Sequence, residues 1–151
     1  MSYFRKELAK RQGDSRSRRS WLFVPYDQLS DEMGPLFRED PKTLGIVLVE
    51  NPWKAARRPY HKQKLALILA NLRHFALEQA DRGVAVRHVV ADGPYATALD
   101  PLIPELGPLR VMAPAERELR ADLARLEKQG YLQFIPHEGW LSTAEQFRES
   151  D

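Results

Sequence analysis

The sequence has 151 residues, 43% hydrophobic and 29% charged, so it is long enough for one buried core and too short for two ordinary ones. It holds 23 Lys and Arg against 21 Asp and Glu, and a formal net charge of +2 says little about partners. Cysteine is absent, which excludes disulfide bonds, thiolate zinc sites, cysteine-held iron–sulfur clusters and a cysteine nucleophile within this chain.

The first residues carry most of the charge asymmetry. Residues 1–20 hold seven Lys or Arg and two acids, and beyond one possible helical turn they lack a periodic apolar face. Residues 1–19 are therefore predicted to form a flexible basic arm, and residues 20–151 a single α/β domain. No apolar run approaches the ~20 residues that span a bilayer, and no signal-peptide pattern opens the chain, so we expect a cytoplasmic protein.

Two apolar runs in the first third predict strands. Residues 20–26 form a short run that turn residues end, which is typical of a buried strand. Residues 44–50 are apolar on both faces and rich in β-branched side chains, which indicates a central parallel strand. A short helix capped by Ser30 is predicted between the two strands. Its inward-facing residues are Met33, Leu36 and Phe37.

The rest of the sequence alternates helices and strands. Helices are predicted over residues 59–81, 93–107 and 114–130, strands over residues 84–91 and 108–113, and a fifth strand with its exit loop over residues 131–140. Gly83 and Gly130 are placed to end the first and last of these helices, Pro101 and Pro104 break the middle one, and Pro114 lies near the start of the last. The alternation predicts an α/β fold: an open, mainly parallel five-stranded sheet with helices on both faces, similar to a Rossmann fold.

The helix over residues 59–81 has apolar side chains on two opposite faces. At 100° per residue, one set is predicted to pack on the sheet: His61, Leu65, Ile68, Leu69, Leu72, Phe75 and Ala76. The opposite set consists of Ala66, Leu67, Ala70, His74 and Leu77. This outward set predicts that another domain or a second subunit covers the helix, and scattered surface apolar residues are the alternative interpretation.

A basic cluster lies where this helix begins, and residues 51–77 contain no acid. Its members are Lys54, Arg57, Arg58, Lys62 and Lys64. Ligands of open α/β sheets bind beyond the carboxyl ends of strands, and a helix amino terminus adds partial positive charge. The cluster therefore predicts anion binding, with a solvated cationic loop as the alternative.

Motifs for the common nucleotide and catalytic sites are absent from the sequence. It contains neither G-x-G-x-x-G after a strand nor a P-loop, and its four histidines have no metal-ligand spacing, so no metal site is predicted. Asp27, Glu50 and Asp92 each follow a predicted strand and are expected at one edge of the sheet. They could orient a polar ligand, or they could cap loops.

Six segments, in this order, resemble the amino-terminal domain of the photolyase-related proteins, the iron–sulfur bacterial cryptochrome/photolyase branch. The segments are DQLS (27–30), VLVE (47–50), HKQKLALILANLRHFA (61–76), GVAVRHV (83–89), PAERELRADL (114–123) and WLS (140–142). The resemblance covers about residues 20–145. It implies an antenna-type α/β domain that precedes a larger helical domain.

In that family the helical domain holds FAD, a 4Fe–4S cluster on four cysteines, and the groove that accepts damaged DNA. This chain has no cysteine, so the resemblance implies part of a deoxyribodipyrimidine photolyase-related protein without its catalytic domain. The implied partner is the C-terminal helical domain, or else a second copy through the outer face of the helix over residues 59–81. Contact with DNA would be indirect.

The resemblance also implies an antenna pigment, 6,7-dimethyl-8-ribityllumazine, at the carboxyl edge of the sheet. Carried over to this sequence, its binding residues are Tyr26, Asp27, Gln28, Glu50, Trp53, Lys54 and Arg57. Tyr26 stands where the family commonly has glycine, and Lys54 stands where it commonly has an acid. A tyrosine ring would fill space that a flat pigment needs, so a more anionic ligand or an empty pocket are alternatives.

Two functions follow from these observations. The first is the N-terminal domain of a cryptochrome/photolyase-related flavoprotein of light-dependent DNA repair or blue-light sensing, acting as antenna-binding or scaffold domain and not catalytic alone. The second is a free-standing nucleic-acid-binding module, in which residues 5–19 and the basic loop 54–64 contact phosphates. Only Trp53 and Tyr60 lie near that loop to stack on bases. A steep loss of affinity with salt would identify the second.

Overall fold

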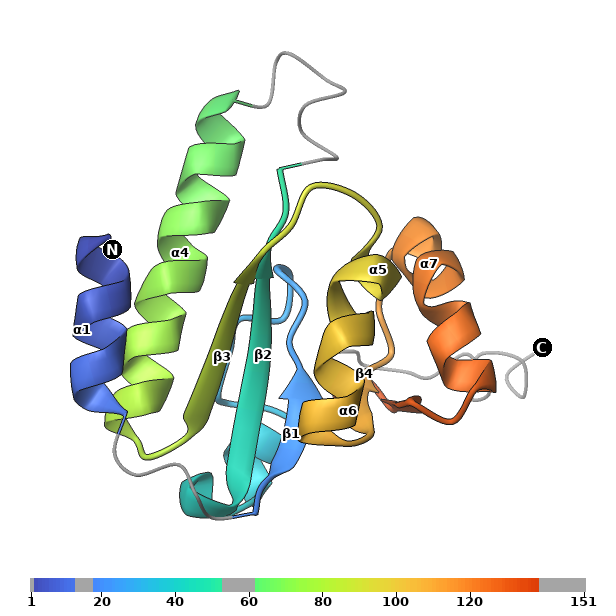
Figure 1. Cartoon of the computed structure of the whole chain (residues 1–151), viewed down its shortest axis with the longest axis horizontal. Helices are drawn as coiled ribbons and strands as arrows, with labels where there is room; N and C mark the ends of the chain where they lie inside the picture. Colours follow the sequence, from blue (N-terminus) through green and yellow to red (C-terminus); the bar gives the residue numbers. More distant parts are fainter. Residues whose placement is uncertain (1, 13–17, 53–61, 139–151) are drawn as a thin grey trace.

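The computed structural model describes residues 2–12, 18–52 and 62–138. Five parallel strands form one sheet in the order β3-β2-β1-β4-β5 (Figure 1). The strands are β1 (Ser20–Phe23), β2 (Leu44–Glu50), β3 (Ala85–Val90), β4 (Leu109–Met112) and β5 (Leu132–Ile135). The α/β fold class, the five strands and their parallel arrangement are confirmed.

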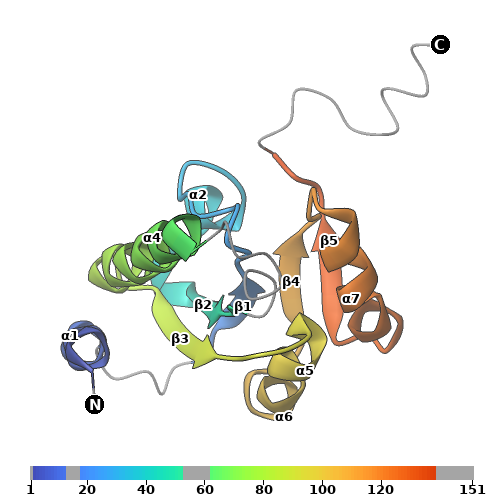
Figure 2. The same cartoon turned by 90° about the horizontal axis from the view of Figure 1, so that it is seen from above.

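The sheet is covered on both faces by helices (Figure 2). One face carries α4 (Lys62–Asp81) and α2 (Pro35–Arg38), and the other carries α5 (Tyr95–Leu99), α6 (Ile103–Leu106) and α7 (Arg117–Lys128). Short 3₁₀ segments, η1 (Pro41–Thr43) and η3 (Asp100–Leu102), join these elements. All seven residues of β2 are buried because the strand has a neighbour on each side and helices above and below it.

The helix ends follow the residues that predicted them. Gly83 and Gly130 have φ angles of 97° and 77°, the left-handed region that glycine adopts at a helix carboxyl end. The segment of residues 93–107 is divided among α5, η3 and α6, as its two prolines predict. In the described part of the chain, no helix is both long enough and apolar enough to cross a membrane.

The amino-terminal segment is the main correction to the predicted organisation. Residues 1–19 were expected to form a flexible arm, but Tyr3–Arg11 form helix α1, which lies beside α4 (Figures 1 and 2). Two apolar side chains one turn apart, Phe4 and Leu8, are buried in the core under α4. Gln12 then bonds the edge strand, donating Nε2 to Val86 O at 2.8 Å and accepting from Val86 N at 3.3 Å.

Two smaller predictions also need correction. The short helix α2 starts after Gly34 and not at Ser30, whose hydroxyl accepts from the Glu32 amide in a turn. Phe37 of α2 is exposed and does not face the core, whereas Leu36 is buried. Helix α7 begins at Arg117, after Pro114 and not at it.

Candidate functional site

The candidate site lies at the carboxyl edge of the sheet. The order of strands reverses at β1, with β2 and β3 on one side and β4 and β5 on the other. The crevice between the carboxyl ends of β1 and β4 is where open α/β sheets bind their ligands. The residues that follow β1 and β4, together with the end of β2, are therefore the first to consider.

Glu50, the last residue of β2, is held by side chains from two neighbouring elements. Arg73 of α4 donates Nε to Oε1 at 2.5 Å and Nη2 to Oε2 at 3.0 Å. His88 of β3 places Nε2 2.8 Å from Oε1, and both the Glu50 and His88 side chains are about 95% buried, at 6% and 5% exposure. Phe4 of α1 covers the group, with its ring edge-on to His88 and 5.5 Å from the Arg73 guanidinium carbon. The carboxylate is thus engaged inside the domain, and its predicted contact with a ligand stays a prediction.

The charge states of this cluster follow from burial and from the ion pair. Burial acts to raise the pKa of Glu50, but the hydrogen bonds and charges of Arg73 and His88 outweigh it, and the pKa is lowered. Burial lowers the pKa of His88 and outweighs the opposite effect of Glu50, while the charges of Arg5 and Arg73 lower it further. Glu50 is therefore ionised and His88 neutral at pH 7. Both ring nitrogens of His88 are buried, and within the described residues neither meets hydrogen-bond geometry, although Nε2 lies 2.8 Å from Glu50 Oε1.

The lowered pKa of His88 predicts that mild acid weakens folding. The ordinary pKa of a histidine is 6.5. As the pH falls below this value, His88 is protonated in the unfolded chain while it stays neutral in the folded chain. The contribution of neutral His88 to the free energy of unfolding is fully present above pH 6.5. It is lost as the pH falls from 6.5 toward the lower pKa of the folded state. We expect the urea midpoint to drop between about pH 7.5 and 5.5, and to drop less in His88→Leu. His74→Gln, at an exposed histidine of α4, is the matched control; an unchanged slope in His88→Leu would refute the assignment.

Two side chains that follow β1 reach across the crevice to β4 and α7. Tyr26 donates its hydroxyl to Oε2 of Glu116, the residue that precedes α7, at 3.0 Å. Gln28 is 2% exposed and donates Nε2 to the carbonyl of Met112, the last residue of β4, at 2.9 Å. Asp27, between them, is exposed. The exits of β1 and β4 are therefore tied together by side-chain hydrogen bonds.

The wall of the crevice beyond Tyr26 is formed by α5 and α7. Tyr95 at the start of α5 packs its ring 5.9 Å from that of Phe23. Asp122 of α7 accepts hydrogen bonds from the Tyr95 amide at 2.6 Å and from the Ala96 amide at 3.3 Å, and so caps α5. Burial raises the pKa of Tyr95 to about 12, with the charges of Asp122 and Asp27 adding to it. Burial, then Asp27, Tyr95 and Glu118, also raises the pKa of Tyr26.

Three of the predicted binding residues, Trp53, Lys54 and Arg57, lie outside the described residues, as do Arg58, Tyr60 and His61. Of the predicted basic cluster the structure describes Lys62 as the first residue of α4 and Lys64 as an exposed side chain. Asp92, the third predicted carboxylate, is exposed in the loop after β3. The predicted anion site therefore stays a prediction.

Several amino-terminal cations are engaged within the domain. Lys10 and Arg11 pair with Glu7 at 3.0 and 3.5 Å, and Arg11 also pairs with Asp81 at 3.1 Å. Arg19 donates to the carbonyls of Pro41, Leu44 and Gly83 at 2.9 to 3.3 Å. Three of the basic side chains of the predicted arm are therefore bonded to acids or carbonyls of the domain itself. Phosphate binding by residues 5–19 stays a prediction.

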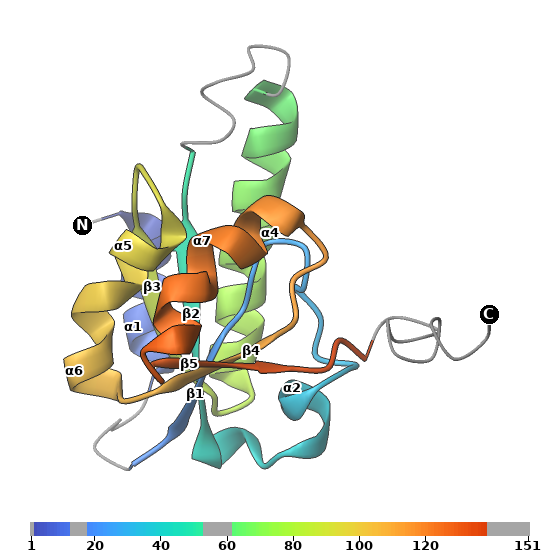
Figure 3. The same ribbon diagram turned by 90° about the vertical axis from the view of Figure 1, so that its right-hand side faces the viewer.

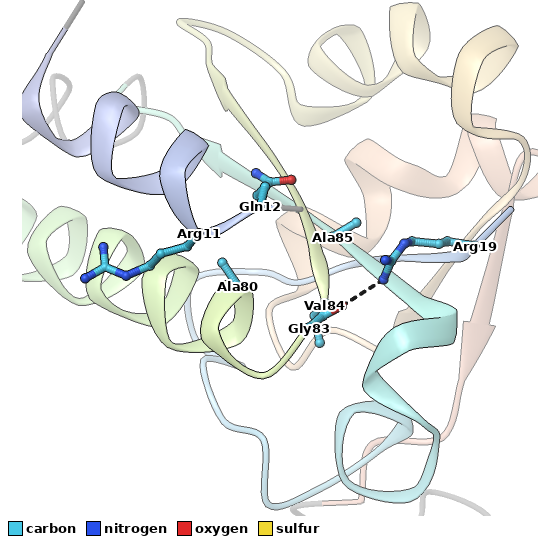
Figure 4. A pocket seen from close by; sticks show the side chains of 7 residues that line it. All are labelled: Arg11, Gln12, Arg19, Ala80, Gly83, Val84 and Ala85. Carbon is cyan, nitrogen blue, oxygen red and sulfur yellow. Dashed lines mark hydrogen bonds between the residues drawn. The ribbon is translucent and has the colours of Figure 1, made fainter. Parts of the chain in front are cut away.

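A small pocket opens beside Arg19 at the amino edge of the sheet (Figure 4). Its lining residues are Arg11, Gln12, Arg19, Ala80, Gly83, Val84 and Ala85. Its volume is about 30 Å³, room for a water molecule and far below the ~300 Å³ of a small-molecule site. Arg19 points at the Gly83 carbonyl that ends the turn after α4, so its role here is structural.

The amino-terminal half of α4 extends beyond the carboxyl ends of the strands (Figures 1 and 3). From Gln63 to Asn71 no side chain is buried, whereas Leu72, Phe75 and Ala76 are buried against the sheet as predicted. Leu65, Ile68 and Leu69, also predicted to face the sheet, are only half-buried.

The outward side of α4 remains open in the described structure. Leu67 is 61% exposed, and Ala66, Ala70 and His74 are exposed as well. Leu77, predicted to belong to this outward set, is half-buried and packs against the core under α4. An apolar surface therefore runs along the projecting half of the helix, where a partner was expected.

Comparisons with known proteins identify the family. Residues 22–150 match the model of the family described as deoxyribodipyrimidine photo-lyase-related protein. The chain belongs to this family. It is also 33% identical over 104 residues to the (6-4) photolyase of Agrobacterium fabrum (strain C58), a match that covers 64% of this chain and 20% of that protein. The photolyase-related chain thus spans about a fifth of the length of this relative, and the resemblance inferred from its sequence segments is confirmed.

Membership of the family raises the question of which cofactors the chain itself could hold. Without cysteine, it cannot supply the thiolate ligands of a 4Fe–4S cluster. Two of the four described residues expected to contact an antenna pigment, Gln28 and Glu50, are buried and bonded inside the domain, and Tyr26 is bonded to Glu116. Sequence reasoning missed Arg73, Phe4 and Glu116 as partners of these residues.

Proposed function

We propose that this chain is the N-terminal α/β domain of a photolyase-related flavoprotein of light-dependent DNA repair or blue-light sensing. In this proposal it acts as a scaffold domain and is not catalytic alone, and a helical domain that binds FAD docks on the projecting half of α4. Membership of the photolyase-related family and the span of about a fifth of a (6-4) photolyase support the first part. The exposed apolar side of α4 supports the second part, the docking of a helical domain.

The projecting half of α4 has the composition of a protein interface. Its apolar side chains lie in one continuous stretch, LALILA, that neither the sheet nor α1 buries. Covering a leucine fully is worth about 1.5–3 kcal/mol, so a partner surface gains stability by packing there. Small side chains at Ala66 and Ala70 let a second helix approach closely. Residues 51–77 lack acids, so a partner with carboxylates around an apolar patch would match the helix in charge.

The test is direct binding of this chain to the part of the Agrobacterium fabrum (6-4) photolyase that lies outside the match. The two are co-expressed, and the affinity is measured after purification. Leu67→Glu places a charge in the proposed interface and is expected to weaken binding roughly tenfold or more. Phe37→Glu is the matched control, because Phe37 is similarly exposed, at 67%, but lies on α2.

The outcomes of this experiment separate the possible occupants of α4. Equal binding by Leu67→Glu, or no binding by the wild-type chain, would count against the docking role. Sedimentation of the chain alone provides the second measurement. A dimer that Leu67→Glu dissociates would instead favour a second copy of this chain as the occupant.

A further inference from the structure

We propose that Tyr26, held by Glu116, closes the ligand crevice at the reversal point of the sheet, so that this chain binds no flat-ring pigment of the ribityl-lumazine kind there. The proposal is independent of the docking role of α4. The exits of β1 and β4, which carry Tyr26 and Glu116, both lie within the described residues.

The position of the contact is the first step. Open α/β sheets bind ligands between the two strands whose crossovers run in opposite directions, here β1 and β4. Tyr26 is three residues beyond the end of β1, and Glu116 is four residues beyond the end of β4. The hydroxyl-to-carboxylate contact of 3.0 Å therefore spans the mouth of the crevice from one wall to the other.

The floor of the crevice is closed by a second contact. Gln28, two residues after Tyr26, donates to the Met112 carbonyl, and its side chain is 2% exposed. A buried amide that loses its partner costs about 1–3 kcal/mol, so a ligand cannot displace Gln28 without replacing that hydrogen bond. Tyr26, two residues before it, is half-buried and is bonded to Glu116.

The electrostatic surroundings also disfavour an anionic ligand. In addition to burial, the negative charges of Asp27 and Glu118 raise the pKa of Tyr26, and the charge of Asp122 raises the pKa of Tyr95. With Glu116, which accepts from Tyr26, four carboxylates lie near these two tyrosines, and like charge disfavours a phosphate group beside them. A phosphorylated cofactor such as flavin mononucleotide is therefore expected to bind even less readily than a neutral lumazine.

The group at the end of β2 gives no alternative cradle for such a pigment. The Glu50 carboxylate is 6% exposed and is already engaged by Arg73 and His88, so little of it is accessible to a ligand. The pocket beside Arg19 is at the opposite edge and holds about 30 Å³. An antenna pigment fits neither place.

Absorption titration tests the proposal with 6,7-dimethyl-8-ribityllumazine as the probe and flavin mononucleotide as a parallel arm. Wild-type protein is expected to retain no visible band after gel filtration. Tyr26→Gly removes the ring and is expected to retain the lumazine at least tenfold more tightly than wild type. Tyr131→Gly, the same exchange at an exposed tyrosine before β5, is expected to behave as wild type.

Circular dichroism and thermal melting establish that each variant is folded, and Tyr26→Ser replaces Tyr26→Gly if the glycine variant is not. Uptake of lumazine by the wild-type chain would overturn the proposal, whatever the variants do. Absence of uptake by the folded Tyr26 variant would also overturn it, because the ring would then not be what closes the crevice.

Discussion

Replacing Arg73 with methionine is expected to lower the free energy of unfolding by about 2–3 kcal/mol. The Glu50 carboxylate is 6% exposed and accepts two hydrogen bonds from this guanidinium. Methionine keeps an unbranched apolar side chain at this position, removes the guanidinium that lies over the Phe4 ring, and leaves a buried negative charge beside a neutral histidine. We take the low end of the range for broken buried pairs because Arg73 itself is 46% exposed. Urea denaturation at pH 7 gives the free energy.

Two further variants decide whether the buried charge is the cause. Glu50→Gln removes that charge, so Arg73→Met is expected to cost much less in the Glu50→Gln background than alone. Arg125→Met breaks a surface pair between Arg125 and Asp100, whose side chains are 49% and 43% exposed, and is expected to change the free energy of unfolding little, because water screens exposed pairs. A loss at Arg73 no larger than that at Arg125 would contradict the structural role of the cluster.

The fold was predictable from the sequence because each central element has one dominant local signal. The run over residues 44–50 has the pattern of a strand covered on both faces, and Gly83 and Gly130 fix two helix ends. Helix α1 gave no such signal. Only Phe4 and Leu8 face the core, and their burial depends on α4 and β3, which are far away in the sequence. A tertiary contact of this kind overrides the polar composition of the segment.

The site was less predictable than the fold. The positions of Glu50 and Tyr26 at strand exits follow from periodicity, so their location at the carboxyl edge could be inferred. Their partners could not. Arg73 is 23 residues from Glu50, and Glu116 is 90 residues from Tyr26, so only the crossover geometry brings each pair together. From sequence alone, a carboxylate at a strand end suggests a ligand-binding residue, because its partner inside the domain is not visible.

A methyl group at Gly45 is expected to destabilise the protein by about 1–3 kcal/mol, although alanine suits the backbone there. Gly45 lies in β2, is paired in register with Trp21 of β1, and does not have a positive φ. A Cβ at this position would lie 2.5 to 2.6 Å from Cε3, Cδ2 and Cζ3 of the indole. Comfortable carbon contacts are ~3.5–4.0 Å, so the ring or the strand would have to move. Glycine here allows two central strands to pack around a large ring.

Replacing Trp21, the other residue in the clash, separates the clash from other effects of Gly45→Ala. Trp21 is half-buried and packs against the core under α5 and α7, so a turn of its ring away from Gly45 would disturb that packing. In a Trp21→Leu background the added methyl meets a smaller, more flexible side chain, and Gly45→Ala should then cost little or become favourable through reduced chain entropy in the unfolded state. Chemical denaturation of the four proteins gives the coupling energy, for which we expect about 1 kcal/mol or more. An equal cost of Gly45→Ala in both backgrounds would mean that the indole is not what requires glycine at this position.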